Sequence, residues 1–292
     1  MEAEEGTRMM LKQVVYALDR QGEKEIRSLH ARLKREGIFC GSLEQWERDV
    51  RNCRRGERKI NRENLRNYLL FITDSPKLLR EASEEGFAVI GFCHSTDDYF
   101  PGASYVLQSF DGIDADFLEE YLLRSQGRPV EVARTRRLVL RETRMEDFSS
   151  LYRISLQPGM RYGLEEKPGE PEEERQKLNA YIKTAYRLYG FGLWTVLCRG
   201  RVIGRCGITP FRLEDGNFAL ELGYMLDERE QHHGYGTEMC QAVIRYARKR
   251  LETEELWCRI HPDNVSSIKL AERLGFSRIF TGSDGLLYFQ RT

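Results

Sequence analysis

Apolar and polar residues follow one another in short blocks through the first part of the chain. Between helical patterns stand apolar runs at residues 13–18, 38–40, 68–73, 87–92 and 103–110. Apolar runs without alternation are typical of strands buried on both faces of a parallel sheet, with helices in the connections. We therefore expect a Rossmann-like α/β domain here. The first run is also compatible with a helix that begins at Met9.

A different rhythm begins near residue 137. A strand and a helix open this part, a long helix follows over about residues 172–189, and three strand patterns then come in direct succession, at residues 193–199, 201–211 and 218–226. Strands joined by short polar or glycine turns pair as antiparallel hairpins. A glycine-rich turn, a helix, a strand, a helix and two short strands complete the chain. This order differs from the one expected in the first part.

The two parts meet in residues 125–137, which contain Gly127, Pro129 and four arginines and show little periodicity. Such a segment is typical of a domain boundary. A chain of 292 residues also exceeds one ordinary domain, for which about 100 to 200 residues is usual. We predict two domains, over residues 9–131 and 132–292.

Charge and composition narrow the range of partners. Lysine plus arginine and aspartate plus glutamate each number 46, so no net field favours nucleic acid or an anionic membrane. The longest apolar runs are far shorter than the about 20 residues that span a bilayer. The acidic N-terminus lacks a secretory pattern, and seven scattered cysteines without a C-x-x-C pair indicate free thiols rather than a metal site. We expect a cytoplasmic protein without a membrane or nucleic-acid partner.

Gly234 and Gly236 stand two residues apart, between a strand pattern and a helix pattern. Glycines let the chain turn sharply, and the free amides and the dipole of a helix N-terminus attract an anion such as a pyrophosphate. The spacing matches neither G-x-x-x-x-G-K-[ST] nor G-x-G-x-x-G, which disfavours nucleoside triphosphates and nicotinamide cofactors. On the spacing alone, an ordinary tight turn is the alternative.

Four segments together resemble a known family. Residues 231–238, QHHGYGTE, match the [QR]-x-x-G-x-[GA] acetyl-coenzyme A motif of the Gcn5-related N-acetyltransferase (GNAT) superfamily. ALELGYML resembles the family's splayed central strand, HPDN through LGF its downstream segment, and LVLRETRMEDFSSLY its first strand and helix. The resemblance covers about residues 137–292 and is closest to the ribosomal-protein alanine N-acetyltransferase branch. It implies a mixed, splayed central sheet flanked by helices.

The resemblance implies an acyltransferase that moves an acetyl group from acetyl-coenzyme A directly to a primary amine, on a protein N-terminus or on a small molecule. The loop implied to bind the pyrophosphate comprises Gln231, His232, His233, Gly234, Tyr235, Gly236 and Thr237. The residues implied to bind the pantetheine arm are Met225, Leu226, Asp227 and Asn264. Asn264 could instead serve only as a helix N-cap. The two histidines could instead be exposed to solvent without binding the coenzyme.

Two residues are implied to carry the chemistry. Glu221, on the central strand, would take a proton from the amine; a carboxylate that faces solvent or pairs with an arginine is the alternative. Family members often protonate the departing thiolate with a tyrosine, but Ala271 stands at that position here. Ser267 would replace that tyrosine as the proton donor. The alternative is that Ser267 is only a serine on the helix surface. The acceptor pocket is implied to lie at about residues 156–190 and 281–288. The oligomeric state is unknown, and a homodimer is one possibility.

The first domain carries a second resemblance. The segments ITDSPKLLREASEEGFAVIGFC and GASYVLQSF resemble the last strands of haloacid-dehalogenase-like domains, through Asp74 and Ser75. Working phosphatases of that family carry a D-x-D-x-T turn after the first strand; here Asp19 is the approximate counterpart, and Gln21 replaces the second acid. The resemblance implies a degenerate domain that binds or docks. Two alternatives to an active transferase stay open: a catalytically weak acyl-coenzyme A sensor or docking module, and a phosphatase in the first domain.

Overall fold

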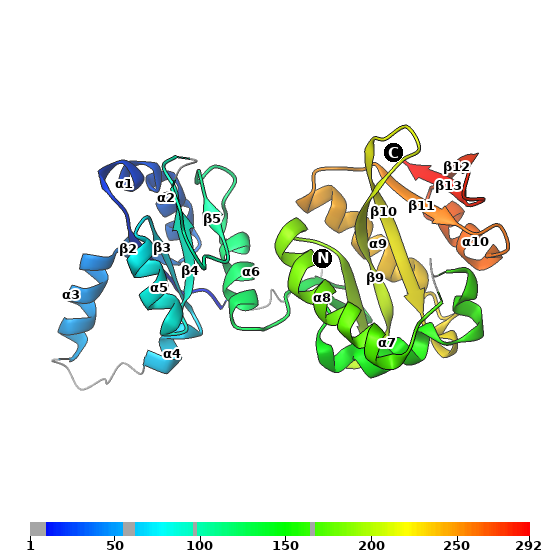
Figure 1. The fold of residues 1–292 in the computed structure, drawn as a ribbon, viewed down its shortest axis with the longest axis horizontal. Coiled ribbons are helices and arrows are strands. Elements are labelled where there is room, and N and C mark those ends of the chain that lie inside the picture. Colours follow the sequence, from blue (N-terminus) through cyan, green and yellow to red (C-terminus); the bar gives the residue numbers. More distant parts are fainter. Residues whose placement is uncertain (1–9, 55–61, 96–97, 164–166) are drawn as a thin grey trace. The chain divides into compact units, whose positions relative to one another are not determined.

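The computed structural model describes residues 10–54, 62–95, 98–163 and 167–292 (Figure 1). The chain forms two compact units that divide between Arg128 and Pro129. The division falls a few residues before the predicted boundary, because Glu131–Arg134 forms a strand, β6, that belongs to the sheet of the second unit. No helix in the described ranges is long and apolar enough to cross a membrane.

The first unit is built around a five-stranded sheet in the order β2-β1-β3-β4-β5, in which every neighbouring pair is parallel. Its strands are β1 (Gln13–Ala17), β2 (Phe39–Ser42), β3 (Leu69–Thr73), β4 (Ala88–Phe92) and β5 (Val106–Leu107). Every residue of β3 and β4 is buried, as expected of central strands covered on both faces. The predicted parallel α/β architecture is therefore confirmed, and the first apolar run forms a strand.

Helices cover both faces of this sheet. They are α1 (Arg20–Glu25), α2 (Arg27–Arg35), α3 (Leu43–Arg54), α4 (Arg62–Arg66), α5 (Pro76–Glu84) and α6 (Ala115–Ser125). One core joins the sheet to α2 and α6 through residues such as Leu29 and Leu118, and a second core joins it to α3 and α5 through Trp46 and Leu79. The unit thus has its own hydrophobic interior on each side of the sheet.

The second unit contains an eight-stranded sheet in the order β12-β13-β11-β10-β9-β8-β7-β6. Its further strands are β7 (Leu138–Arg141), β8 (Leu193–Cys198), β9 (Arg201–Arg212), β10 (Phe218–Leu226), β11 (Leu256–Ile260), β12 (Ser277–Thr281) and β13 (Leu287–Arg291). All neighbours are antiparallel except β10 and β11, which run parallel. The mixed sheet confirms the fold class predicted for this part of the chain.

The helices of the second unit flank this sheet. They are η1 (Met145–Asp147), α7 (Phe148–Ser155), η2 (Pro158–Tyr162), α8 (Pro171–Tyr189), η3 (Glu228–Glu230), α9 (Tyr235–Arg250) and α10 (Val265–Arg273). In Figure 1, α9 lies behind β9 and β10, whereas α7 and α8 lie in front of the sheet. Met239, Cys240 and Val243 of α9 are fully buried in the core beneath it. This core fixes the start of α9 next to the end of β10.

Candidate active site

β10 and β11 separate in the middle of the sheet. They share a single residue pair, Glu221 with Trp257, although β10 continues to Leu226 and β11 to Ile260. Beyond Glu221, the edge of β10 that faces β11 therefore pairs with no strand of the described residues, and the space beside this edge is termed the cleft. The splayed central strand implied by the sequence is present.

The loop that follows β10 ends at a helix N-terminus with free amides. Gly234 is the N-cap of α9 with a φ of 79°, a conformation that favours glycine, and His232 has a φ of 64°. Within the described part of the chain, the amides of residues 232–237 donate to no protein acceptor. Free amides and the helix dipole together make an anion site. The backbone at this point is suited to hold a diphosphate.

The side chains of the loop have other roles. The side-chain amide of Gln231 donates to the carbonyl oxygen of Leu226 at 3.3 Å, and the backbone amide of Gln231 donates to Glu228. His232 and His233 are exposed, and His233 stacks on Tyr235 with ring centroids 5.9 Å apart. On the sequence alone, solvent exposure of both histidines was the alternative to coenzyme binding. The loop therefore offers a ligand its backbone more than these side chains.

Only one of the three predicted contacts on β10 faces the cleft. The amide of Asp227 donates to the carbonyl oxygen of Ile203 on β9 at 2.8 Å. In an antiparallel ladder alternate residues bond to the same neighbour, so the backbone groups of Met225 and Asp227 point to β9 and those of Leu226 point away from it. This geometry favours Leu226 over Met225 and Asp227 for the backbone contact, and sequence alone does not show which residues of a strand face its partner.

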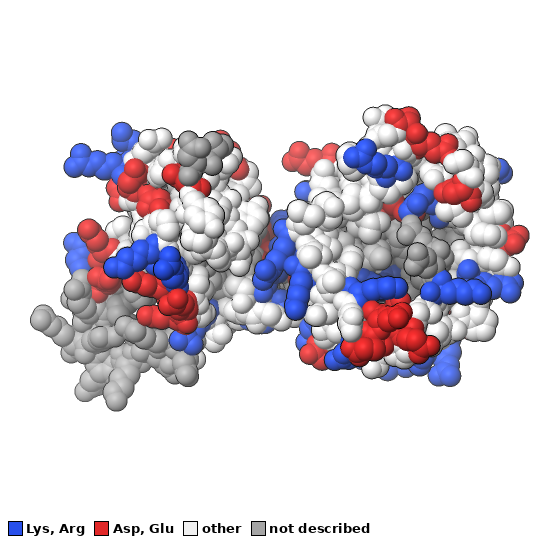
Figure 2. Space-filling view, in the orientation of Figure 1, with Lys and Arg blue, Asp and Glu red and all other residues white. Residues whose placement is uncertain are grey.

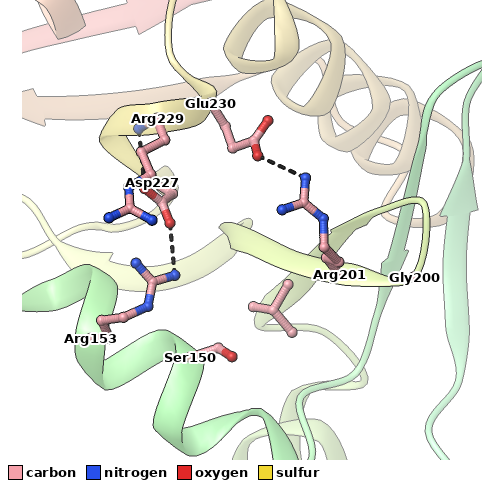
Figure 3. Close-up of a pocket in the computed structure, with 8 residues that line it drawn as sticks. Ser150, Arg153, Gly200, Arg201, Asp227, Arg229 and Glu230 are labelled. Carbon is pink, nitrogen blue, oxygen red and sulfur yellow. Dashed lines mark hydrogen bonds and ion pairs between the residues drawn. The ribbon is translucent and has the colours of Figure 1, made fainter.

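Asp227 instead anchors the end of β10. Its buried carboxylate accepts a hydrogen bond from Arg153 of α7 at 2.7 Å (Figure 3). It also accepts one from Gln157 at 3.0 Å. Burial would raise the pKa of Asp227, but the hydrogen bonds from Gln157 and Arg153 outweigh it and lower the pKa below its ordinary value. In the same pocket Arg201 pairs with Glu230 at 3.1 Å. These ion pairs tie α7 and the β8–β9 turn to the start of the loop.

Glu221 forms an ion pair at the point where the cleft begins. Its carboxylate accepts bonds from the guanidinium of Arg259 at 2.6 and 3.1 Å and from the amide of Arg259 at 3.1 Å. The guanidinium also lies 4.9 Å from the ring centroid of Phe211. Pairing with an arginine was the alternative for Glu221, and these contacts favour it. Direct proton transfer to this carboxylate would compete with the pair.

Asn264 and Ser267 lie together at the start of α10, and Ser267 contacts Tyr224 of β10. The side-chain oxygen of Asn264 caps the helix by accepting from the amide of Ser267 at 3.2 Å, and it also accepts from Ser266 at 3.0 Å. On the sequence alone, this cap was the alternative to a contact between Asn264 and the pantetheine arm. It leaves the side-chain amide nitrogen able to donate to a ligand, so the two roles are compatible.

Tyr224 is a residue that the sequence did not single out. Its hydroxyl donates to the carbonyl oxygen of Ser267 at 3.4 Å. Ser267 and Ala271 are four residues apart and therefore share one face of α10. Burial raises the pKa of Tyr224 well above its ordinary value of 10.0, so the phenol stays protonated. A tyrosine on the strand thus brings a hydroxyl to the helix face where Ala271 lacks one.

Tyr162 and His261 stack at the same end of β11. Their ring centroids are 4.7 Å apart, and Tyr162 comes from η2, in the segment expected to form the acceptor pocket. Figure 2 shows a hollow in the drawn face of the second unit. In the sequence, His261 directly follows a predicted strand and opens the HPDN segment. Its contact with η2 depends on the tertiary fold.

A separate cluster lies in the first unit. Asp19, Asp74 and His94 follow the carboxyl ends of β1, β3 and β4, three adjacent strands of the parallel sheet. The Nε2 atom of His94 lies 3.2 Å from Asp74 and 3.4 Å from Asp19. Asp19 also caps α1 by accepting from the amides of Gln21 and Gly22. The ligand atoms of the cluster lie within 4.8 Å of one another. The sequence had drawn attention to the two acids but not to the histidine.

Because His94 pairs with two acids, we expect the stability of the first unit to depend on pH. Burial would lower the pKa of His94, but Asp74 and Asp19 outweigh it and raise the pKa above 6.5. A raised folded-state pKa contributes stability that is complete below the unfolded value, about 6.5, and is lost as the pH rises through the folded value. We expect the free energy of unfolding of this unit to fall over that range. Urea titrations should show the fall in the natural protein and in His30→Gln but not in His94→Gln, and a fall that persists in His94→Gln would contradict the assignment.

Comparisons with known proteins concern the second unit. Residues 137–277 match the model of the family described as acetyltransferase (GNAT) domain. The uncharacterized protein YkkB of Bacillus subtilis is 33% identical over 89 residues, 30% of this chain and 51% of that protein. The uncharacterized N-acetyltransferase p20 of Bacillus licheniformis is 32% identical over 77 residues, 26% of this chain and 42% of that protein. This chain thus spans about half the length of the curated relatives it matches.

A solved acetyltransferase from Agrobacterium tumefaciens has a TM-score of 0.47 and 24% identity, and the match covers 54% of this chain and 92% of that one. The second unit has a mixed, splayed sheet and a helix N-terminus with free amides. Residues 137–277 of this unit are similar to the GNAT acetyltransferase domain. Acetyltransferases of this family take the acetyl group from acetyl-coenzyme A.

Proposed function

We propose that the second unit is an acetyl-coenzyme A-dependent N-acetyltransferase that acts on a primary amine, either a protein N-terminus or a small molecule. One observation carries the proposal: the free amides of residues 232–237 stand at the end of the strand that borders the cleft. A molecule with a diphosphate at one end and an extended amide arm fits this arrangement, because the helix N-terminus binds the charge and the open strand edge binds the arm.

The residues that would hold the coenzyme follow from these contacts. The amides of residues 234–237 would bind the diphosphate. The backbone of Leu226, which faces the cleft, and the side-chain amide of Asn264 would bind the pantetheine arm from opposite sides. When bound, the coenzyme supplies an acetyl group as a thioester. In the transfer, the amine nitrogen forms a bond to the acetyl carbon, the carbon–sulfur bond breaks, the nitrogen loses a proton and the sulfur gains one.

We propose Tyr224 rather than Ser267 as the residue that protonates the sulfur. A phenol is a stronger acid than a serine hydroxyl, and the Tyr224 phenol is protonated and contacts α10, so it has a proton to give. We expect Tyr224→Phe to lower kcat by about 10- to 100-fold with little change in acetyl-coenzyme A affinity. Ser267→Ala should change kcat by less than about threefold, because its backbone and not its side chain contacts Tyr224. The opposite ranking of the two variants in steady-state assays would contradict this assignment.

The acceptor would bind at about residues 156–190, which contain η2 and α8, and at residues 281–288. The first turn of α8 carries three glutamates at 172–174, and Glu174 pairs with Lys177 at 2.8 Å. Acids in a first turn stabilise the helix dipole, so these residues have a structural reason to be present. The stacked pair of Tyr162 and His261 would border the acceptor. These features accommodate an amine without selecting one class of acceptor.

Two measurements test the proposal. Isothermal titration with acetyl-coenzyme A should show binding, and thiol release should then depend on an added amine from a panel of peptides with free N-termini and polyamines. Binding without release over the whole panel would support the alternative of a weakly active sensor or docking module. No binding at millimolar coenzyme would contradict both. For the first unit, phosphatase activity stays an alternative that a phosphoester assay with magnesium would test.

A further inference from the structure

The turn between β6 and β7 is fastened to the first turn of α9. Glu238, in that first turn, accepts hydrogen bonds from the hydroxyl of Thr135 at 2.6 Å, from the amide of Arg137 at 3.1 Å and from the guanidinium of Arg137 at 2.6 Å. The guanidinium also donates to the carbonyl oxygen of His233 at 2.9 Å and lies 4.4 Å from the ring centroid of Tyr235. One arginine therefore contacts the loop at three points.

The charge of Glu238 needs this partner if the loop is to bind an anion. Burial would raise the pKa of Glu238, but the bonds from Thr135 and Arg137 outweigh it and lower the pKa, so the carboxylate is ionised at neutral pH. An ionised carboxylate beside the free amides would repel a diphosphate. The guanidinium at 2.6 Å offsets that charge. It thereby leaves the potential of the helix N-terminus positive.

The bond from Arg137 to His233 also sets the direction of an amide. In a trans peptide the C=O and the following N–H point in opposite directions, and the structure contains no cis peptide in its described residues. The guanidinium holds the oxygen of His233 on the side of the β6–β7 turn. The amide of Gly234 must then point to the other side of the loop, where it donates to no protein acceptor.

We propose that Arg137 is a positioning residue for the diphosphate of acetyl-coenzyme A. It orients the amide of Gly234 and neutralises Glu238, and it needs no contact with the ligand to do so. The inference rests on the proposed function, because it assumes that the loop binds the coenzyme. It adds that the affinity is controlled from the β6–β7 turn, which lies about 100 residues earlier in the chain than the loop itself.

The test compares a donor that has the diphosphate with one that lacks it. For Arg137→Ala we expect coenzyme A affinity, measured by isothermal titration, to fall by about 10- to 100-fold, the loss typical of a charge-assisted hydrogen bond. The kcat/KM for S-acetylpantetheine, which has no diphosphate, should stay within about twofold of the natural protein's. Arg136→Ala removes the same charge from an exposed neighbour in the same turn and should leave both values unchanged.

Two further variants separate the charge from the geometry. Arg137→Lys keeps a cation but cannot make all the bonds of the guanidinium, so its loss of affinity should be intermediate. Adding Glu238→Gln to Arg137→Ala should restore part of the affinity, because the uncompensated carboxylate is gone. Unchanged coenzyme A affinity in Arg137→Ala, or an equal loss with both donors, would overturn the inference. If the natural protein itself fails to bind coenzyme A, it is the proposed function that fails.

Discussion

Gly234→Val is expected to weaken acetyl-coenzyme A binding by at least about 100-fold, or about 2.8 kcal/mol, while the protein keeps its fold. The φ of 79° at this position is strained for any L-residue and most of all for a β-branched one. A valine would shift the backbone to a negative φ and turn the free amides away from one another. A Cβ would also lie 3.4 Å from the guanidinium of Arg137.

Gly216→Val is the matched control for this substitution. Gly216 has a φ of 87° in the turn between β9 and β10, and a Cβ there would meet no atom within 4 Å. Both variants should lose about 1–2 kcal/mol of stability from the strained conformation. Only Gly234→Val should lose affinity in isothermal titration. Equal affinity in the two variants would show that the loop backbone does not bind the coenzyme.

Glu221→Ala is expected to lower the free energy of unfolding of the second unit by about 3 kcal/mol, the cost of removing one partner of a largely buried ion pair. The side chains of Glu221 and Arg259 are only 14% and 20% exposed, so water would compensate the remaining guanidinium poorly. The exposed pair of Arg248 and Glu254 provides the control. Glu254→Ala should cost less than about 1 kcal/mol in the same urea titration. Similar costs for the two variants would contradict the structural role of Glu221.

A pH–rate profile then decides whether Glu221 also takes the amine proton. If its carboxylate stays in the ion pair, the amine must arrive uncharged and its own pKa sets the midpoint of kcat/KM. We expect midpoints near about 8 for a peptide α-amine and near about 10.4 for a lysine-like amine. A midpoint that is the same for both acceptors and disappears in Glu221→Gln would assign the proton transfer to Glu221.

Much of the fold was predictable because its signals are local. Apolar runs between helical patterns identified the parallel sheet, since strands covered on both faces exclude polar residues throughout. The succession of short strands identified the mixed sheet. The glycine at 234 located the free helix N-terminus, since only glycine adopts a positive φ there without strain. In each case the residue types themselves carry the constraint.

The candidate site was less predictable, because its residues depend on contacts between distant segments. Glu221 could be read as a base or as an ion-pair partner until Arg259 was placed beside it by the neighbouring strand. The orientation of Met225 and Leu226 depends on the register with β9.

By itself, therefore, the sequence determined the two architectures, and its resemblance to a known family implied the anion-binding loop and the coenzyme, because these signals lie within short segments. Only the tertiary structure decided which charges are neutralised and which amides are free. It joined Arg137 to Glu238, Tyr224 to Ser267 and the acids of the first unit to His94. Such pairings follow from strand order and helix packing, and a single sequence holds no local record of either.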